Sequence, residues 1–427
     1  MNRALSSLLL GTTVIAFAGC TKGGETEILT IEEKPLTPVT IRFHQHGGYF
    51  TEQDFDELIV QPVKKKYSHI TAEMDKSTVD LTEHLAKGDT TIDFLVTYHG
   101  QLTSYLDMGV YLDIAPLAKQ YKFDLSRFEP GALDAITAIP DNKELIALPY
   151  ANNLNALYYN KDLFDKFGVP YPKDGMFWED AIELAKKVTR MEDSIQYRGL
   201  DTDGLGRYLF PLSLNHINAK TDEVIVNSDP YKRVMEIGRQ IYTIPGNEYN
   251  KAGDTITRFL KDRNIAMLAT INLFLRLREV PDLNWDVAQY PSYKERPNTY
   301  GQYDLHIVAP MAYSKKREDQ MRVMEVLFSD EVQMIMSRKS AKQPVMKDPK
   351  FKQMFAQDLP ELKGKNIAGV FKSNSAPAPV NSIYYYKASK FVSDEFVNVV
   401  SNNKDINSAL RDAEDQIKLL IKTEKGK

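Results

Sequence analysis

Two histidines separated by one residue, His44 and His46, are the first side chains along this sequence that could act together. Residues two apart on an extended segment point to the same side, so both imidazoles could reach one metal ion. Zinc sites usually add further histidines and a carboxylate to such a pair. The chain has seven histidines, and the others do not stand at ligand spacing in the sequence. We therefore predict no metal site and no cofactor.

Motifs for covalent catalysis are the second kind of chemistry that we consider. The sequence contains neither a Gly-x-Ser-x-Gly nucleophile elbow nor a His-Glu-x-x-His zinc motif. Its single cysteine, Cys20, lies near the N-terminus and is expected to be modified there, so we expect no thiol nucleophile. Carboxylates are abundant, and a glycosidase pair could exist without a visible motif. We predict that the chain is not an enzyme and keep a glycoside-active enzyme as an alternative.

Tyrosine supplies many side chains that suit a polar ligand. The chain has 23 tyrosines against two tryptophans, and each tyrosine offers a flat apolar ring and a hydroxyl. The formal net charge of -4 argues against a nucleic-acid partner and against a polybasic membrane surface. With 427 residues and 43% hydrophobic composition, the chain is long enough for two large lobes.

The N-terminus has the pattern of an exported protein. A basic start is followed by an apolar run at residues 4–18 that is short for a membrane span, which is typical of a signal peptide at 1–19. The quartet Phe-Ala-Gly-Cys, ending at Cys20, is similar to a bacterial lipobox, whose cysteine carries the lipid anchor. An ordinary signal peptide is the alternative. Residues 20–38, with paired glycines and two prolines, predict a solvated tether.

The folded body begins with alternating strands and helices. This order predicts a parallel, doubly wound sheet, in which ligands bind beyond the carboxyl ends of the strands. The expected strands are 39–43, 70–74 and 92–96, and the expected helices between them are 51–66 and 81–87. The loops after the first and third strands therefore hold the first candidate ligand contacts.

One later stretch carries a family pattern. It contains Leu148-Pro149-Tyr150, the run Leu-Tyr-Tyr-Asn-Lys-Asp-Leu-Phe at 157–164, Phe-Gly-Val-Pro at 167–170, and Phe177-Trp178-Glu179. Asn160 should cap a helix over 161–167 that ends at a left-handed Gly168. In order and spacing, the stretch resembles the crossover segment of bacterial extracellular solute-binding proteins of the maltose-binding type. The family's Thr or Ser before the tryptophan is Phe177 here.

The resemblance implies an α/β fold with two lobes, of the periplasmic-binding-protein type. Each lobe would hold a mostly parallel sheet flanked by helices, and three crossovers would join the lobes. The N-terminal lobe is expected at 39–150 and 266–310, and the C-terminal lobe at 151–265 and 311–427. After the first crossover near Pro149, the second is expected at 259–267 and the third at 301–314.

With three crossovers, the ligand is expected in a cleft that closes by hinge bending. Sugars suit aromatic residues because a pyranose has an apolar face and a rim of hydroxyls. Each candidate could instead be a solvated loop residue, and Arg207 an ion-pair partner. Phe274 stands where the family has a stacking Trp. The ligand contacts implied by the resemblance are His46, Tyr49, Thr97, Tyr98, His99, Tyr150, Asn153, Arg207, Tyr208, Asn272, Phe274, Tyr303, Asp304 and Tyr385, with Tyr384 and Tyr386 as alternatives to Tyr385.

The function that the resemblance implies is capture of a carbohydrate, expected to be an oligosaccharide, for the permease subunits of an ABC importer. The protein would be a monomer held by a lipid on Cys20 at the outer face of the cell membrane. An alternative with the same fold is a carbohydrate receptor for a sensor kinase, or a surface polysaccharide-binding protein. The sequence leaves open which sugar is bound.

Overall fold

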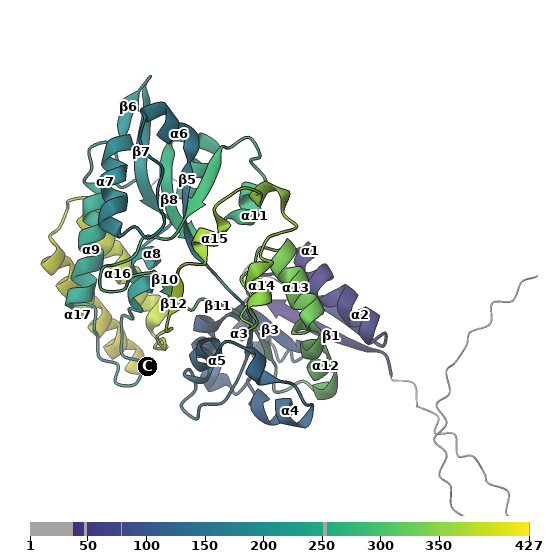
Figure 1. Cartoon of the computed structure of the whole chain (residues 1–427). Helices are drawn as coiled ribbons and strands as arrows, with labels where there is room; N and C mark the ends of the chain where they lie inside the picture. The colour runs from purple at the N-terminus through teal and green to yellow at the C-terminus, as the bar shows by residue number, and fades with distance from the viewer. Residues whose placement is uncertain (1–36, 47–48, 78, 251–253, 427) are drawn as a thin grey trace, which may run out of the picture. The chain divides into compact units, whose positions relative to one another are not determined.

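A computed structural model describes residues 37–46, 49–77, 79–250 and 254–426 (Figure 1). The expected signal peptide, the lipidation site Cys20 and nearly all of the expected tether lie outside these residues. Within the described ranges, no helix combines the length and the apolar character that crossing a membrane requires.

The first sheet has five strands, in the order β2 (Ile70–Met74), β1 (Val39–Gln45), β3 (Phe94–Tyr98), β11 (Leu305–Pro310) and β4 (Leu148–Asn152). β1 is parallel to β2 and β3, whereas β11 is antiparallel to β3 and β4. In β1 the buried Ile41 and Phe43 flank the exposed Arg42, as the pleat of a strand requires. The carboxyl ends of β1, β2 and β3 therefore share one edge with the amino end of β11.

The second sheet also has five strands, in the order β6 (Arg190–Glu192), β7 (Ile195–Thr202), β8 (Ile265–Ile271), β5 (Asn155–Asn160) and β9 (Trp285–Ala288). β7 and β8 are parallel, and β5 is antiparallel to both of its neighbours. The apolar run of β8 is buried along almost its whole length, as expected of a central strand. A two-stranded sheet pairs β10 (Thr299–Gln302) with β12 (Asn374–Ala376).

Helices surround each sheet and complete a separate hydrophobic core. We call the part built on the first sheet the first lobe; its helical elements are α1 (Glu52–Phe55), η1 (Asp56–Val60), α2 (Gln61–Lys66), α3 (Leu81–Ala86), η2 (His99–Met108), α4 (Ile114–Gln120), η3 (Leu125–Arg127), α5 (Pro130–Thr137), α12 (Arg317–Leu327), α13 (Asp330–Lys339) and α14 (Pro349–Gln353).

The second lobe is built on the second sheet, and in it α9, α16 and α17 pack against one another (Figure 1). Its helical elements are α6 (Lys161–Phe167), α7 (Trp178–Val188), α8 (Gly206–Leu209), η4 (Phe210–Leu212), α9 (Asp229–Tyr242), α10 (Thr255–Thr257), η5 (Arg258–Asp262), α11 (Phe274–Leu277), η6 (Pro360–Leu362), α15 (Ile367–Val370), α16 (Tyr385–Val400) and α17 (Ile406–Lys425).

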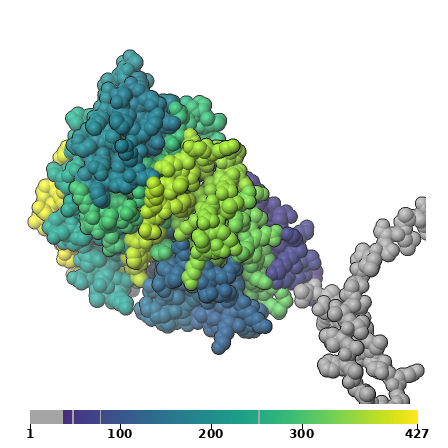
Figure 2. Space-filling model, in the orientation of Figure 1, coloured from purple at the N-terminus to yellow at the C-terminus, as the bar shows by residue number. Residues whose placement is uncertain are grey.

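The chain passes between the two cores three times, at 151–154, 300–305 and 351–355. Hydrogen bonds tie the first passage to the second and to Gln343, which precedes the third. The Asn152 N–H donates to the Gln343 carbonyl, and the Asn153 N–H donates to the Asp304 carbonyl, each at 2.9 Å. We call Asn152, Asn153, Asp304 and Gln343 the crossover cluster. On the face shown in Figure 2, yellow-green residues that follow the second passage lie between blue first-lobe and teal second-lobe surface.

Two of the three passages differ from the expected places. The segment 259–267 was expected to return to the first lobe, but β8 pairs with β5 and β7 of the second sheet. The segment 301–314 was expected to enter the second lobe, but β11 lies in the first sheet. Residues 265–288 therefore pack in the second core and 311–351 largely in the first. An apolar run predicts a buried strand, but its distant partners decide which sheet it joins.

Candidate binding site between the lobes

The carboxyl edge of the first sheet holds several of the predicted residues. His46 follows β1, Tyr98 ends β3, His99 begins η2, and Asp304 immediately precedes β11. The pairing of β1 with β3 and of β3 with β11 brings these positions to one edge. The side chain of His46 is 44% exposed, and its Nδ1 lies 3.7 Å from Asp80. Strand pairing thus gathers residues that are far apart in the sequence.

Tyr98 also contacts the second lobe. Its hydroxyl hydrogen-bonds with the hydroxyl of Tyr386 in α16, and the two rings lie edge to face with centroids 6.3 Å apart. Gly100 allows this approach: a Cβ added there would lie 3.0 Å from Asn381 Nδ2 and 3.2 Å from the Tyr386 hydroxyl. The two lobes therefore meet at a pair of tyrosines next to a residue without a side chain.

Asp304 links the crossover cluster to this aromatic contact. Its Oδ2 accepts a hydrogen bond from Asn153 Nδ2 at 3.1 Å. Beside it, the ring of Tyr49 lies 4.8 Å from that of His306 and 6.4 Å from that of Tyr98. We call Tyr49, Tyr98, His99, Asp304 and Tyr386 the interlobe cluster.

Burial keeps the imidazoles beside Asp304 uncharged near neutral pH. It lowers the pKa of His99, an effect that the Asp304 carboxylate opposes without cancelling. It also lowers the pKa of His306 to about 4. Burial, helped by the charge of Asp304, raises the pKa of Tyr49 to about 12, and burial raises the pKa of Tyr98 well above its ordinary value. Together with His306, the interlobe cluster thus combines phenols and a carboxylate with neutral imidazoles, of which His99 is buried.

Two cations near the passages are already paired with carboxylates. Arg207 Nε lies 3.0 Å from Asp203 Oδ1, and the guanidinium also hydrogen-bonds with Asn155. Lys342 Nζ lies 3.3 Å from Asp54 Oδ2 in a pair that is largely buried. Arg207 therefore forms the ion pair named above as the alternative to a ligand contact.

The structure places Tyr208 and Phe274 in the second core rather than at the interlobe surface. Both are 0% exposed. The ring of Tyr208 packs 5.2 Å from Trp178, and that of Phe274 packs 5.6 Å from Tyr158. Because neither ring has a free face, neither can stack on a ligand in this arrangement. Both residues are aromatic, as the expected pattern requires, but their burial could not be predicted from the local sequence.

Two predicted residues of the first lobe lie behind the interlobe cluster. Tyr150 is fully buried, its ring is stacked 4.6 Å from Phe50, and its hydroxyl donates to the Tyr49 carbonyl at 3.4 Å. Thr97 is also fully buried in β3. Tyr150 therefore supports Tyr49 instead of lining the surface itself.

Asn272 and Tyr303 have local partners as well. The Asn272 side chain accepts from the Phe274 N–H at 3.1 Å at the start of α11, and its amide donates to Ala341 O at 2.6 Å. The Tyr303 hydroxyl lies 3.5 Å from Glu129 in the first lobe. Tyr303 thus bridges the second passage to the first lobe.

Tyr385 is held by a buried histidine of its own lobe. The Tyr385 and His216 rings are stacked, with centroids 4.8 Å apart and 8° between their planes. His216 in turn hydrogen-bonds with Tyr231 at 2.7 Å and with Ser389 at 3.1 Å. The neighbouring Tyr386, which was an alternative to Tyr385 among the predicted contacts, is the one that contacts Tyr98. Three consecutive tyrosines signalled a ring at this place, but the helix had to be known to show which one faces the first lobe.

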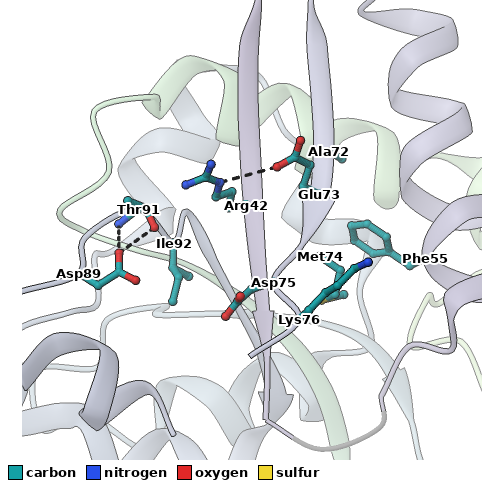
Figure 3. A pocket seen from close by; sticks show the side chains of 10 residues that line it. All are labelled: Arg42, Phe55, Ala72, Glu73, Met74, Asp75, Lys76, Asp89, Thr91 and Ile92. Carbon is teal, nitrogen blue, oxygen red and sulfur yellow. Dashed lines mark hydrogen bonds and ion pairs between the residues drawn. The ribbon is translucent and has the colours of Figure 1, made fainter. Parts of the chain in front are cut away.

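Two cavities lie away from the interlobe cluster. One of about 530 Å³ is in the first lobe, at the carboxyl end of β2, where Asp75, Lys76 and Asp89 line it (Figure 3). The other, of about 290 Å³, is in the second lobe beside Asp203 and Tyr249. None of the predicted ligand contacts lines either of them.

Comparison with known proteins gives a family match. Residues 59–362 match a family model described as bacterial extracellular solute-binding protein. The sn-glycerol-3-phosphate-binding periplasmic protein UgpB of Brucella abortus is 40% identical over 68 residues, which are 16% of this chain. That match covers 15% of the length of this curated relative.

Solved structures match over nearly the whole chain. An ABC substrate-binding protein of Listeria monocytogenes in complex with cycloalternan has a TM-score of 0.74 and 21% identity, covering 90% of this chain and 99% of that one. The maltose-bound MalE3 of T. maritima has a TM-score of 0.66 and 17% identity, covering 89% and 99%. These likenesses confirm the α/β, two-lobed fold predicted from the sequence. The prediction of a mostly parallel sheet in each lobe is wrong for the second sheet, where only β7 and β8 are parallel.

Proposed function

Because this chain belongs to the family of bacterial extracellular solute-binding proteins, we propose that it captures a carbohydrate between its two lobes. The interlobe cluster is the proposed site, with Asn153 and Tyr385 beside it. The observation that carries the proposal is the meeting of Tyr98 with Tyr386 next to Asp304, because it joins residues of both lobes. The Listeria monocytogenes protein in complex with cycloalternan and the maltose-bound T. maritima MalE3 share this fold.

The chemistry of the cluster suits a neutral polyhydroxylated ligand. The rings of Tyr49, Tyr98 and Tyr386 provide apolar faces for the C–H face of a sugar, and their hydroxyls can exchange hydrogen bonds with its rim. The Asp304 carboxylate accepts hydrogen bonds from sugar hydroxyls, and ionised acceptors form stronger bonds than neutral ones. Opening and closing would occur about the crossover cluster, where the first passage is bonded to the second passage and to Gln343.

The same electrostatics disfavour an anionic ligand such as sn-glycerol 3-phosphate. A phosphate needs cations or a row of N–H donors, and arginine is over-represented at such sites. Here Arg207 is paired with Asp203, Lys342 is paired with Asp54, and burial lowers the pKa of His99. The Asp304 carboxylate would repel the phosphate. We therefore favour a carbohydrate over the ligand named for the Brucella abortus relative.

We further propose that the protein is a monomer anchored through a lipid on Cys20 and that it delivers its ligand to an ABC importer. The proposal is supported by the N-terminal sequence pattern, with its apolar run ending at Cys20, and by membership of an extracellular binding family. Ligand binding would select the closed arrangement, which the permease would recognise. Radiolabelled palmitate incorporation that is lost in Cys20→Ser tests the anchor separately from ligand binding.

Calorimetry on the chain from residue 21 onward tests the ligand class. We expect saturable binding of at least one of maltose, mannotriose, cycloalternan and tagatose, and none of sn-glycerol 3-phosphate. Tyr386→Ala should weaken the binding, whereas the matched control Tyr384→Ala, on the neighbouring residue, should leave it unchanged. Binding of the phosphate without any carbohydrate would overturn the ligand class. Carbohydrate binding that Tyr386→Ala leaves intact would overturn the site.

A further inference from the structure

A cluster outside the proposed ligand site brings His44, Asp75 and His84 together in the first lobe. His44 lies in β1, Asp75 follows β2, and His84 lies in α3. Their potential ligand atoms lie within 4.8 Å of one another. His44 Nδ1 lies 3.0 Å from Asp75 Oδ2, and His84 Nε2 lies 3.4 Å from the same oxygen. One carboxylate oxygen therefore faces two imidazole nitrogens.

A second carboxylate decides which nitrogen of the neutral His84 ring carries the proton. The turn at Gly88, with φ of +72°, returns the chain so that Asp89 lies 3.0 Å from His84 Nδ1. Asp89 Oδ1 accepts hydrogen bonds from both the N–H and the hydroxyl of Thr91. The Asp89 carboxylate therefore faces His84 Nδ1 as a hydrogen-bond acceptor. In the neutral imidazole, Nδ1 then carries the proton and Nε2 keeps a lone pair.

That lone pair has no hydrogen-bond partner in the described part of the chain. His84 Nε2 is buried and unpaired, and it faces an oxygen of Asp75 that is also an acceptor. Two acceptors that face each other repel unless a proton or a metal cation lies between them. His44, 0% exposed, has a buried unpaired Nε2 as well. A carboxylate behind a histidine whose other nitrogen is free is the usual outer support of a metal-binding histidine.

The cluster also has an entry path and an oriented carboxylate. Asp75 and Asp89 both line the cavity of about 530 Å³ at this end of the sheet, and the side chain of Asp75 is 25% exposed (Figure 3). The Ser77 N–H donates to Asp75 Oδ1 at 3.1 Å, which turns Oδ2 toward the two histidines. An ion could therefore reach the cluster from the cavity without opening the core.

We propose that His44 Nδ1, Asp75 Oδ2 and His84 Nε2 form a binding site for a divalent transition metal ion, with Asp89 supporting His84. Two imidazoles and one carboxylate are the ligand types that Zn²⁺ accepts, with a fourth position left to water. Imidazole ligands favour such metals over Ca²⁺ and Mg²⁺, which take oxygen ligands. The bound ion would hold the ends of β1 and β2 to α3. This site does not depend on the proposed carbohydrate function.

The test is a calorimetric titration of Zn²⁺ into the untagged, metal-stripped chain carrying Cys20→Ser, which removes its single thiol. We expect one ion per chain and a rise in Tm with Zn²⁺. His84→Gln should abolish both effects. Asp89→Asn should weaken binding by about 10–100-fold, the usual effect of losing an outer partner. Co²⁺ should give visible absorption bands of nitrogen and oxygen coordination, and His84→Gln should remove them.

The matched control is His69→Gln. His69 also pairs with an aspartate, with Nε2 3.1 Å from Asp319 Oδ1, but its pair lacks a second imidazole. Zn²⁺ binding should be unchanged in this variant. The absence of saturable binding, or binding that His84→Gln leaves intact in a folded chain, overturns the proposal. Because His84 is near the surface, with 11% side-chain exposure, this result does not depend on whether the fully buried His44 tolerates substitution.

Discussion

The two lobes bring different kinds of position to the surface where they meet. In the first lobe, Tyr98, His99 and Asp304 stand at the ends of paired strands. In the second lobe, the aromatic residues expected there, Tyr208 and Phe274, are buried in the core. The second lobe instead contributes Tyr386 from the start of a helix. The residues predicted at strand ends thus lie where the lobes meet, whereas Tyr208 and Phe274 do not.

The physical reason is that strand pairing fixes the position of a strand's end, whereas it does not fix which face of a helix is exposed. The carboxyl ends of parallel strands must share an edge, whatever the length of chain between them. A residue in a helix turns by about 100° per position, so an error of one residue moves a ring from the surface into the core. The predictions below test this difference between the lobes, starting with the largest effect.

Replacing the buried ring of the second lobe should affect stability and not ligand binding. Phe274→Ala removes a side chain with 0% exposure that packs against Tyr158 and Phe355. We expect the free energy of unfolding to fall by about 3–5 kcal/mol, the usual range for such a cavity. Chemical denaturation followed by circular dichroism measures it. A carbohydrate affinity reduced more than tenfold in the folded variant would show that Phe274 does contact the ligand.

The buried His216 should make stability dependent on pH. Burial lowers its pKa from 6.5 to about 3, so it stays neutral in the folded chain while the unfolded chain takes up a proton below pH 6.5. Its contribution is therefore lost as the pH falls from about 6.5 toward 3, by about 1.4 kcal/mol per pH unit. Between pH 7 and pH 5 we expect His216→Gln to lose about 2 kcal/mol less than the wild type.

Denaturation at pH 7 and pH 5 measures this difference, and His69→Gln serves as the control because His69 has an aspartate partner. Equal losses in the wild type and His216→Gln would mean that His216 does not stay neutral in the fold. In that case the stacked Tyr385 would rest on a charged ring, and the description of the second lobe would have to change.

Replacing either of the two tyrosines that join the lobes should weaken ligand binding and change the stability of the fold little. Tyr98→Ala and Tyr386→Ala each remove one ring of the interlobe contact, while both cores stay intact. We expect each to weaken carbohydrate binding about tenfold, or about 1.4 kcal/mol. Tyr208→Phe, in the second core, is the matched control. Loss of carbohydrate affinity in Tyr208→Phe but not in the two variants would mean that the ligand contacts Tyr208 and not the interlobe tyrosines.

Much of the fold was visible in the sequence because its signals are local. Asn160 caps α6, which spans Lys161–Phe167, and Gly168 ends it with φ of +65°, each as predicted. The strands at 39–45 and 70–74 follow their apolar patterns. The family and the two-lobed fold followed from the pattern that begins at Leu148. These features depend on residues close together in the chain.

The rest depended on contacts between distant residues. The apolar run of β8 indicated a strand, but its partners β5 and β7 placed it in the second sheet. His84 lies forty positions after His44, so the sequence spacing gave no sign of a shared site. The contact between the two rings became visible only in the structure, where α3 lies beside β1. Tyr386 could be named only as an alternative to Tyr385, because the start of α16 decides which tyrosine faces Tyr98.

The smallest predicted effect comes from filling the space at Gly100. A Cβ there would lie 2.7 Å from the Tyr98 ring and 3.2 Å from the Tyr386 hydroxyl, so both side chains would have to shift. These atoms are the tips of side chains, so Gly100→Ala should change the free energy of unfolding by less than about 1 kcal/mol. Closure of the two lobes should be affected more, because it requires the rings of Tyr98 and Tyr386 to meet. Carbohydrate affinity should therefore fall by about two- to fivefold. Calorimetry on Gly100→Ala, with Gly426→Ala at the end of α17 as a glycine control away from the interlobe cluster, would measure it. An unchanged affinity would mean that the lobes do not meet at Tyr98 and Tyr386 when ligand is bound.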